Sequence, residues 1–282
     1  MRNVIAFLNM KGGVCKTSLC KEIGFYLTEK CAKRILIIDV DPQANCTQSF
    51  LERYDIIKNK LINKDLNLPS IQKIFSPGEG RLDEPKIEEI ILKLSDNLHI
   101  VPGELRTIFM EREMASGAAE QRLYNFIDEY NIKEKYDYVL IDCPPTYSFY
   151  TITALLASDL YLIPVTPDAY SLLGVDLLQQ VIERLKSNYR VNFQNHPLDN
   201  LGIIFTKIPK KPGSGIKNNI EQIMEAYEDK EMPFFQNQYL KAGKIPTSKL
   251  STFILDRQDE SLKNNIEMIS KEFMNKVGEY NE

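Results

Sequence analysis

The feature that most constrains this chain is a glycine-bearing turn between a short apolar run and a helical stretch. The run Val4–Leu8 is apolar at every position, and Asn9–Thr17 (NMKGGVCKT) leads from it into helical periodicity over Thr17–Lys30. Continuous apolar runs of this length are typical of strands buried on both faces of a parallel sheet. A glycine-rich turn from such a strand into a helix aims backbone N–H groups at one point, so the sequence predicts an anion site there.

The rest of the chain repeats this alternation of strand and helix. A second helical stretch is predicted over Ala169–Lys186, and further apolar runs occupy Ile35–Ile38, Leu98–Val101, Tyr138–Ile141, Leu160–Val165 and Leu201–Phe205. Alternating strands and helices with right-handed crossovers build a doubly wound sheet. We therefore predict an α/β fold with a mainly parallel sheet flanked by helices, and ligands at the carboxyl ends of the strands.

Both predicted helices carry an apolar face. On the first, Gly24 would permit close approach to the sheet, and the apolar residues are Leu19, Cys20, Ile23, Tyr26 and Leu27. On the second, the stripe expected to face the sheet is Leu173, Leu177, Leu178, Val181, Ile182 and Leu185.

Length and composition indicate one globular unit. No Ser/Gly-rich linker divides the 282 residues, so we expect a single domain over residues 1–282 with a peripheral helical insertion at about residues 55–95. The longest apolar runs are far too short to cross a bilayer. The chain passes from Met1 straight into the first run, so we expect no signal peptide and a cytoplasmic protein. The five cysteines form no C-x-x-C pair, which argues against a disulfide framework or a zinc site.

Lys16 and Thr17 turn the predicted anion site into a triphosphate site. Lys16 would reach the β and γ phosphates, and the Thr17 hydroxyl would bind Mg²⁺. The strict pattern G-x-x-x-x-G-K-[ST] fails, because Met10 and Cys15 hold its two glycine positions. A plain glycine-rich turn ahead of a helix is the alternative for this string alone. If the position of Cys15 requires a positive φ, its β-carbon costs on the order of 1 kcal/mol.

Acidic residues end two of the predicted strands. Asp39 and Asp41 follow the run at Ile35–Ile38, and Asp142 follows Tyr138–Ile141. A single aspartate at a strand end is more often a helix N-cap or a turn former. Three such acids at one edge of the sheet, beside a lysine-bearing loop, together predict a Mg·ATP site.

Three motifs in this chain resemble those of the deviant Walker A ATPases, most closely the ParA/Soj branch that serves DNA partitioning. The signature K-G-G-x-x-K-[ST] stands at Lys11–Thr17, D-x-D-P-Q-x-N at Asp39–Asn45, and the Walker B strand at Tyr138–Pro145. A later family stretch, I-P-R-x-x-R-L-S, is matched in shorter form by Ile245–Ser251. The likeness spans about residues 1 to 255, in a short form without an N-terminal helix-turn-helix.

The resemblance implies a role for each matching residue. Lys11 would cross the interface of an ATP-bound sandwich dimer to the partner's phosphates, Lys16 would be the P-loop lysine, and Asp41 would position the attacking water. These three are the implied catalytic residues. The implied Mg²⁺ residues are Thr17, Asp39 and Asp142. The implied nucleotide-binding residues are Lys11, Gly12, Gly13, Val14, Cys15, Lys16, Thr17, Ser18, Lys207 and Pro246.

Basic residues gather in the last third of the chain, although the net charge is −4. They are Lys207, Lys210, Lys211, Lys217, Lys241, Lys244 and Lys249. Among them Lys210, Lys211 and Lys249 are the candidate DNA contacts, and Lys249 matches a DNA-contacting arginine of the family. Ordinary solvation explains any single one of these lysines equally well. No base-reading helix is evident, so binding should be to phosphates and independent of DNA sequence.

The predicted function is ATP-dependent plasmid or chromosome partitioning. An ATP-driven homodimer would bind DNA nonspecifically, associate with the nucleoid, and be released when a ParB-like partner stimulates Mg²⁺-dependent ATP hydrolysis. One alternative is a nucleotide-gated DNA-binding regulator with little turnover. Another is a MinD-like membrane-cycling ATPase, which needs a basic amphipathic C-terminal helix. Here that helix has an acidic rim, which favours core packing and no membrane contact, and its apolar stripe is Leu262, Ile266, Ile269, Phe273 and Val277.

Overall fold

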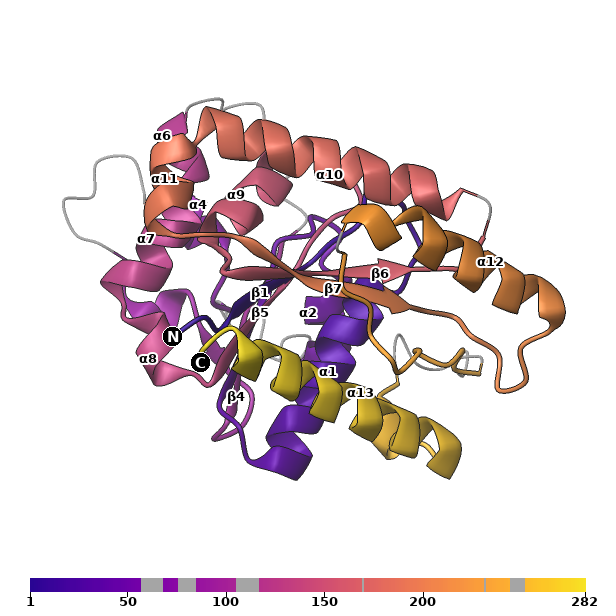
Figure 1. Ribbon diagram of the computed structural model, residues 1–282. Helices are drawn as coiled ribbons and strands as arrows, with labels where there is room; N and C mark the ends of the chain where they lie inside the picture. Colours follow the sequence, from indigo (N-terminus) through magenta and orange to yellow (C-terminus); the bar gives the residue numbers. More distant parts are fainter. Residues whose placement is uncertain (57–67, 76–84, 105–116, 169, 231, 244–251) are drawn as a thin grey trace.

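One sheet forms the centre of the molecule, with helices on both of its faces (Figure 1). The structure is a computed structural model that describes residues 1–56, 68–75, 85–104, 117–168, 170–230, 232–243 and 252–282. Within these ranges the sheet has seven strands in the order β3-β4-β2-β5-β1-β6-β7. Only β3 runs antiparallel to its neighbour. The strands are β1 Val4–Phe7, β2 Ile35–Asp39, β3 Leu92–Lys93, β4 Leu98–Val101, β5 Tyr138–Asp142, β6 Leu160–Val165 and β7 Asp199–Phe205.

The predicted fold class is confirmed, with small shifts at the strand ends. β2 and β5 each extend one residue beyond their apolar runs, so that Asp39 and Asp142 belong to the strands themselves. Within the predicted insertion at about residues 55–95, residues 57–67 and 76–84 lie outside the described ranges. Its described part holds the edge strand β3, which the sequence analysis does not predict, with a short helix and a 3-10 turn. The single-domain assignment stays a prediction.

Helices cover the two faces of the sheet unequally. α1 (Lys16–Cys31) and α13 (Glu260–Glu279) lie side by side on one face, and α7, α9, α10 and α12 cover the other (Figure 1). The remaining bounds are α2 Asn45–Arg53, α4 Gln72–Phe75, α6 Gly117–Glu120, α7 Arg122–Glu129, α8 Ile132–Lys135, α9 Phe149–Ala157, α10 Ser171–Asn188, α11 Arg190–Asn195, α12 Ser214–Ala226, and the 3-10 turns η1 Ile87–Glu89, η2 Glu228–Lys230 and η3 Ile254–Asp256.

The C-terminal helix α13 is a core element. All five residues of its apolar stripe are buried, and the Phe273 ring stacks on Phe7 of β1 with centroids 6.3 Å apart. This confirms the prediction that the stripe packs against the core. Among the described residues, no helix combines the length and the apolarity that a bilayer crossing requires.

The predicted stripe of α10 is partly wrong. Leu173 and Leu177 are 69% and 47% exposed, whereas Gly174, Val175 and Leu178 face the interior. Compared with the predicted orientation, the helix is turned about its axis so that Gly174 faces the loop after β1. A β-carbon on Gly174 would lie 2.9 Å from Asn9 Oδ1. A helical period identifies an apolar stripe, but it does not say which edge of a wide stripe meets the sheet.

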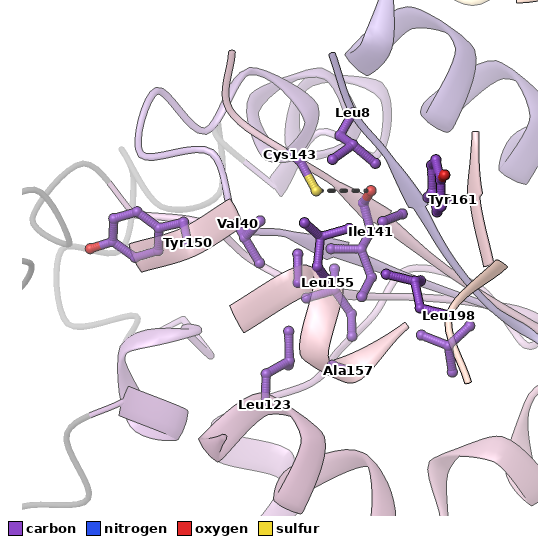
Figure 2. Packing of buried hydrophobic residues seen from close by; sticks show 14 of the residues in the cluster. Leu8, Val40, Leu123, Ile141, Cys143, Tyr150, Leu155, Ala157, Tyr161 and Leu198 are labelled. Carbon is purple, nitrogen blue, oxygen red and sulfur yellow. Dashed lines mark hydrogen bonds between the residues drawn. The ribbon is translucent and has the colours of Figure 1, made fainter. Parts of the chain in front are cut away.

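The first residue after each of three strands points its side chain into the core under α9. Leu8, Val40 and Cys143 come directly after β1, β2 and β5, and all three pack into this core (Figure 2). Cys143 behaves as a small apolar residue, and its thiol makes one weak hydrogen bond to the Ile141 carbonyl at 3.8 Å. Because successive side chains of a strand alternate between faces, Asp39 and Asp142 project toward the opposite face, where α1 begins.

Gly24 supplies a test of this packing. A β-carbon at Gly24 would lie 2.7 Å from Ile37 Cδ1 and 3.3 Å from Leu140 Cδ1, so α1 approaches the sheet as closely as predicted. Gly24→Val should lower the free energy of unfolding by about 2 kcal/mol, because the inserted carbons overpack the core. Chemical denaturation measures this. Gly278→Val is the matched control in α13, where nothing lies within 4 Å, and it should be nearly neutral. Equal effects of the two substitutions would contradict the close approach.

Candidate functional site

The turn between β1 and α1 folds into a tight loop with two left-handed residues. Gly13 has φ 73° and Cys15, the N-cap of α1, has φ 68°. The Thr206 hydroxyl, directly after β7, donates to the Val14 carbonyl at 3.1 Å and ties the loop to the neighbouring strand end. Cys15 therefore has the positive φ that strains a residue with a β-carbon, since a left-handed conformation costs an L-residue roughly 1 kcal/mol or more.

A cavity of about 350 Å³ opens over the N-terminus of α1. Its walls come from the loop, from the segment after β2, and from single residues after β5 and β7. They are Gly13, Val14, Cys15, Lys16, Thr17, Ser18, Asp41, Gln43, Asn45, Pro145 and Lys207. Backbone N–H groups at a helix start, with lysines beside them, make this cavity suited to a phosphate chain.

Lys16 is a buried cation in the floor of this cavity. Its side chain is held in the loop, where Nζ donates to the Lys11 carbonyl at 3.4 Å. Burial lowers the pKa of the Lys16 ammonium, and the Asp142 carboxylate opposes that shift. An anion bound in the cavity would offset the cost of burying this charge.

Asp39 and Asp142 are cross-strand neighbours in the register of β2 and β5, and both are fully buried. The Asp39 carboxylate is already engaged: one oxygen accepts from the Thr47 amide at 2.8 Å and the Thr47 hydroxyl at 2.7 Å, and the other from the Asp41 amide at 3.2 Å. Burial raises the pKa of Asp39, and the hydrogen bonds from Thr47 oppose the shift. Asp39 thus anchors the first turn of α2 and does not line the cavity.

Asp142 is the better candidate for a metal-site carboxylate. Both of its oxygens are buried, and neither makes a hydrogen bond of ordinary geometry within the described ranges, although the Thr17 hydroxyl faces the carboxylate. Burial and the neighbouring Asp39 carboxylate raise the pKa of Asp142, while Thr17 and Lys16 oppose the rise. No group of three or more acidic, His or Cys side chains in the described part of the chain is arranged as a metal site. Mg²⁺ in nucleotide sites takes only one or two protein carboxylates beside phosphates and waters, so Asp142 with Thr17 fits that ion.

Asp41 lies at the wall of the cavity, 7% exposed. Its Oδ1 accepts from the Gln43 amide at 2.9 Å, and its own carbonyl accepts from the Ala44 amide at 2.8 Å. This turn holds the carboxylate in place while leaving it in reach of a bound water.

The structure does not bring Lys11 into the cavity. Its ammonium donates to both oxygens of Asp168, at 2.5 and 2.6 Å, in the loop between β6 and α10. Gly12 also lies outside the cavity wall, and a β-carbon on it would lie 4.0 Å from Pro145 Cβ.

Lys207 lies where two cavities meet. A β-carbon on Gly13 would be 3.8 Å from its Nζ, so the ammonium is close to the phosphate loop. A second cavity of about 340 Å³ shares Cys15, Ser18 and Lys207 with the first. Its other lining residues are Lys21, Glu22, Tyr239, Leu240, Lys241, Ala242, Gly243, Thr252, Ile254 and Arg257. Pro246, predicted beside Lys207, lies outside the described residues.

The candidate DNA lysines differ in their surroundings. Lys210 pairs with Asp259 at 2.8 Å, which offsets its charge, whereas Lys211 is exposed in the same loop. Lys249, with the whole stretch Ile245–Ser251 that carries the fourth motif, falls outside the described ranges.

Sequence reasoning missed several residues of the site. Gln43 and Asn45 lie inside the second motif, and their place in that motif is the signal that could have found them. Asp168 follows β6 at the same edge of the sheet, so the strand-end rule that selected Asp142 applies to it as well. Glu22 and Arg257 of the second cavity are far apart in sequence and carry no such signal.

The loop, its cavity and the strand-end carboxylates define a P-loop nucleotide-binding protein. A family model described as an AAA domain matches residues 2–195. The chain is 33% identical to an uncharacterized protein of Methanocaldococcus jannaschii, over 79% of this chain and 80% of that protein. It is 28% identical to the sporulation initiation inhibitor protein Soj of Bacillus subtilis, over 82% of each. The chain belongs to this AAA-domain family, and within it to the ParA/Soj type, as the motifs predicted.

Solved structures share the fold. A plasmid partition protein of Borrelia burgdorferi bound to AMPPNP superposes with a TM-score of 0.69 at 21% identity, covering 98% of this chain and 99% of that one. Cobyrinic acid a,c-diamide synthase of Mycobacterium smegmatis, with a bound ATP analog and magnesium, gives 0.64 at 20% identity over 86% and 88%.

The strain at Cys15 can be measured. Cys15→Gly should raise the free energy of unfolding by up to about 1 kcal/mol, because glycine tolerates the left-handed conformation, less the entropy it adds to the unfolded chain. Cys15→Ala keeps a β-carbon and should give no such gain, which makes it the matched control. Thermal and denaturant unfolding of both variants provide the comparison, and an equal gain from both would place the cause in the thiol instead of the backbone.

Proposed function

We propose that this protein is a Mg²⁺-dependent ATPase that partitions DNA. The observation that carries the proposal is the convergence of Lys16, Thr17 and Asp41 on one cavity, with the buried Asp142 carboxylate beside Thr17 and Lys16. Support also comes from the ParA/Soj-type relatives, and from similarly folded proteins that bind AMPPNP or an ATP analog with magnesium.

In this mechanism the chain's own residues hold and orient the reactants. The backbone of Gly13–Ser18 and the Lys16 ammonium bind the phosphate chain, and Lys207 adds a second cation beside Gly13. Thr17 and Asp142 would hold the Mg²⁺, which would neutralise charge on the phosphates. Asp41 orients the attacking water from the cavity wall.

Binding of Mg·ATP would relieve an electrostatic imbalance in the free site. Asp39 and Asp142 are buried carboxylates whose pKa values are both raised by burial. A divalent cation beside Asp142 would stabilise its ionised form, and the triphosphate would do the same for the buried Lys16. Nucleotide and metal should therefore bind together more tightly than either alone.

The proposed cycle of dimerisation, DNA binding and release depends on Lys11. We propose that ATP drives a homodimer in which Lys11 contacts the phosphates of the partner subunit. The dimer would bring two lysine surfaces onto DNA at the nucleoid, with Lys211 as a phosphate contact. A ParB-like partner would release it by stimulating hydrolysis.

One observation favours a second candidate. Cys15 replaces a glycine in a left-handed position of the loop and lines both cavities. If its side chain displaces the phosphates, the protein would be a nucleotide-gated DNA-binding regulator with little turnover. Phosphate release with and without DNA and partner separates the two functions. The buried stripe of α13 gives a membrane-cycling role no support.

Lys16→Ala should abolish ATP binding, because the phosphates lose their buried cation. Isothermal titration with an ATP analogue and Mg²⁺ measures the loss, which we expect to exceed roughly a hundredfold, as for a buried charge-assisted contact. Lys30→Ala removes an exposed lysine near the other end of the same helix and should bind normally. Wild-type affinity in Lys16→Ala would refute the assignment of the cavity.

The DNA cycle is tested by salt-dependent DNA titration. ATP should convert weak into strong nonspecific binding, with a steeper salt dependence, because a dimer neutralises more phosphates at a slope of roughly −0.9 per contact. Asp41→Ala should bind ATP but remain on DNA, because the attacking water is no longer oriented. Identical DNA affinity in ATP and ADP would overturn the partition proposal while leaving the nucleotide site intact.

Neighbouring lysines provide a control within that titration. Lys211→Ala should reduce the salt slope of the ATP state, whereas Lys210→Ala should have a smaller effect, because Asp259 already offsets the Lys210 charge.

A further inference from the structure

Lys11 is held within its own subunit by Asp168. The ammonium donates to both carboxylate oxygens, at 2.5 and 2.6 Å, and the two residues are 157 positions apart in sequence. The Lys11 and Asp168 side chains are 29% and 44% exposed, so the pair is partly shielded from water. The loop that follows β1 is thereby joined to the loop that precedes α10.

Both partners are pre-positioned by their own loops. The Asp168 carboxylate accepts from the Thr166 hydroxyl at 2.7 Å, the Tyr170 amide at 3.1 Å and the Ser171 hydroxyl at 3.2 Å. The Lys11 amide donates to Asn9 Oδ1 at 2.9 Å. Neither loop has to rearrange to form the pair, so little conformational entropy is lost beyond that of the lysine side chain.

The packing of α10 brings the two loops together. Gly174 lies in the first turn of α10, six residues after Asp168, and a β-carbon on it would be 2.9 Å from Asn9 Oδ1 and 3.4 Å from Lys11 Cβ. Asn9 is held in turn from β6, because its Nδ2 donates to the Pro164 carbonyl at 2.8 Å. The distance between Lys11 and Asp168 is therefore set by the fold.

We propose that Asp168 is a positioning residue that stores Lys11 in the free subunit and must release it before Lys11 reaches the phosphates of a partner subunit. This inference rests on the proposed dimer function. A single ammonium cannot serve both carboxylate and phosphate at full strength, so the pair within the subunit opposes formation of the ATP dimer. Asp168 thus raises the nucleotide and protein concentrations at which the switch operates.

The pair strength sets the size of the effect. Partly exposed ion pairs contribute modestly, and their loss corresponds to roughly a fivefold change in an equilibrium constant. Asp168→Asn removes the charge, yet its single amide oxygen can still accept from the Tyr170 amide, and its new NH2 group can donate to the Thr166 hydroxyl, so the turn before α10 keeps its hydrogen bonds. Asp176→Asn, within α10 itself, is the matched control, because its carboxylate pairs with a different lysine, Lys230, at 3.1 Å.

The first experiment measures the chemical reactivity of the Lys11 amine, which depends on its pairing with Asp168, and it needs no nucleotide. Nucleotide-free wild type, Asp168→Asn and Asp176→Asn are treated with a limiting amine-acylating ester, and modification of Lys11 is measured by peptide mass spectrometry. Lys11 in Asp168→Asn should react roughly fivefold faster, because the held ammonium must first leave the carboxylate. Asp176→Asn and Asp168→Glu should react like wild type, the second because it restores the pair. Equal Lys11 reactivity in wild type and Asp168→Asn would overturn the proposal.

The second experiment measures the effect of the Lys11–Asp168 pair on dimerisation. Sedimentation with a non-hydrolysable ATP analogue should show dimers of Asp168→Asn at roughly fivefold lower protein concentration than wild type, with Asp176→Asn unchanged. A merely structural role for Asp168 would instead weaken dimerisation through a disturbed α10. If no variant dimerises but Lys11 reactivity still rises in Asp168→Asn, the storage of Lys11 stands and the proposed function fails. If all variants dimerise at one concentration, the storage role fails and the function stands.

Discussion

The structure depends on the burial of opposite charges at one edge of a parallel sheet. Asp39 and Asp142 are paired across β2 and β5 and face the side where α1 begins, and Lys16 starts that helix. The alternation of side chains along each strand requires this, because Leu8, Val40 and Cys143 fill the core on the opposite face. A shift of either strand by one residue would move its aspartate into that apolar core, where an unpaired charge is prohibitively costly. The register of the sheet and the chemistry of its edge are therefore the same constraint.

Each of the buried charges has a different kind of partner, and this separates their roles. Asp39 is satisfied by Thr47 and the Asp41 amide, so it organises α2. The buried Asp142 carboxylate makes no hydrogen bond of ordinary geometry in the described part of the chain and lies beside Thr17 and Lys16, which favours it as the residue that would hold a cation. The resemblance implies a metal role for both carboxylates, whereas the hydrogen bonds of Asp39 are made to its own segment and Asp142 makes none of that kind within the described ranges.

Two residues of the loop between β1 and α1 are held in unusual arrangements. Cys15 keeps a left-handed backbone that suits glycine, and Lys11 is drawn away from the cavity by Asp168. The Cys15 conformation affects the stability of the loop, and the pairing with Asp168 decides where the Lys11 ammonium lies. Because α10 closes on the loop at Gly174, the position of Lys11 depends on how the start of that helix packs.

The layered fold, six of the strands to within a few residues and the position of the loop between β1 and α1 could be predicted from sequence, because they depend on short apolar runs and on residues adjacent in the chain. The sequence also identified Asp41, Lys16 and Thr17, which lie together at the cavity. Three features could not be predicted in this way: which edge of the α10 stripe is buried, the hydrogen bonds of Asp39 to α2, and the ion pair of Lys11 with Asp168. The physical reason is that these outcomes depend on contacts between segments far apart in sequence, such as Gly174 against Asn9, whose geometry is fixed only when the helices pack on the sheet.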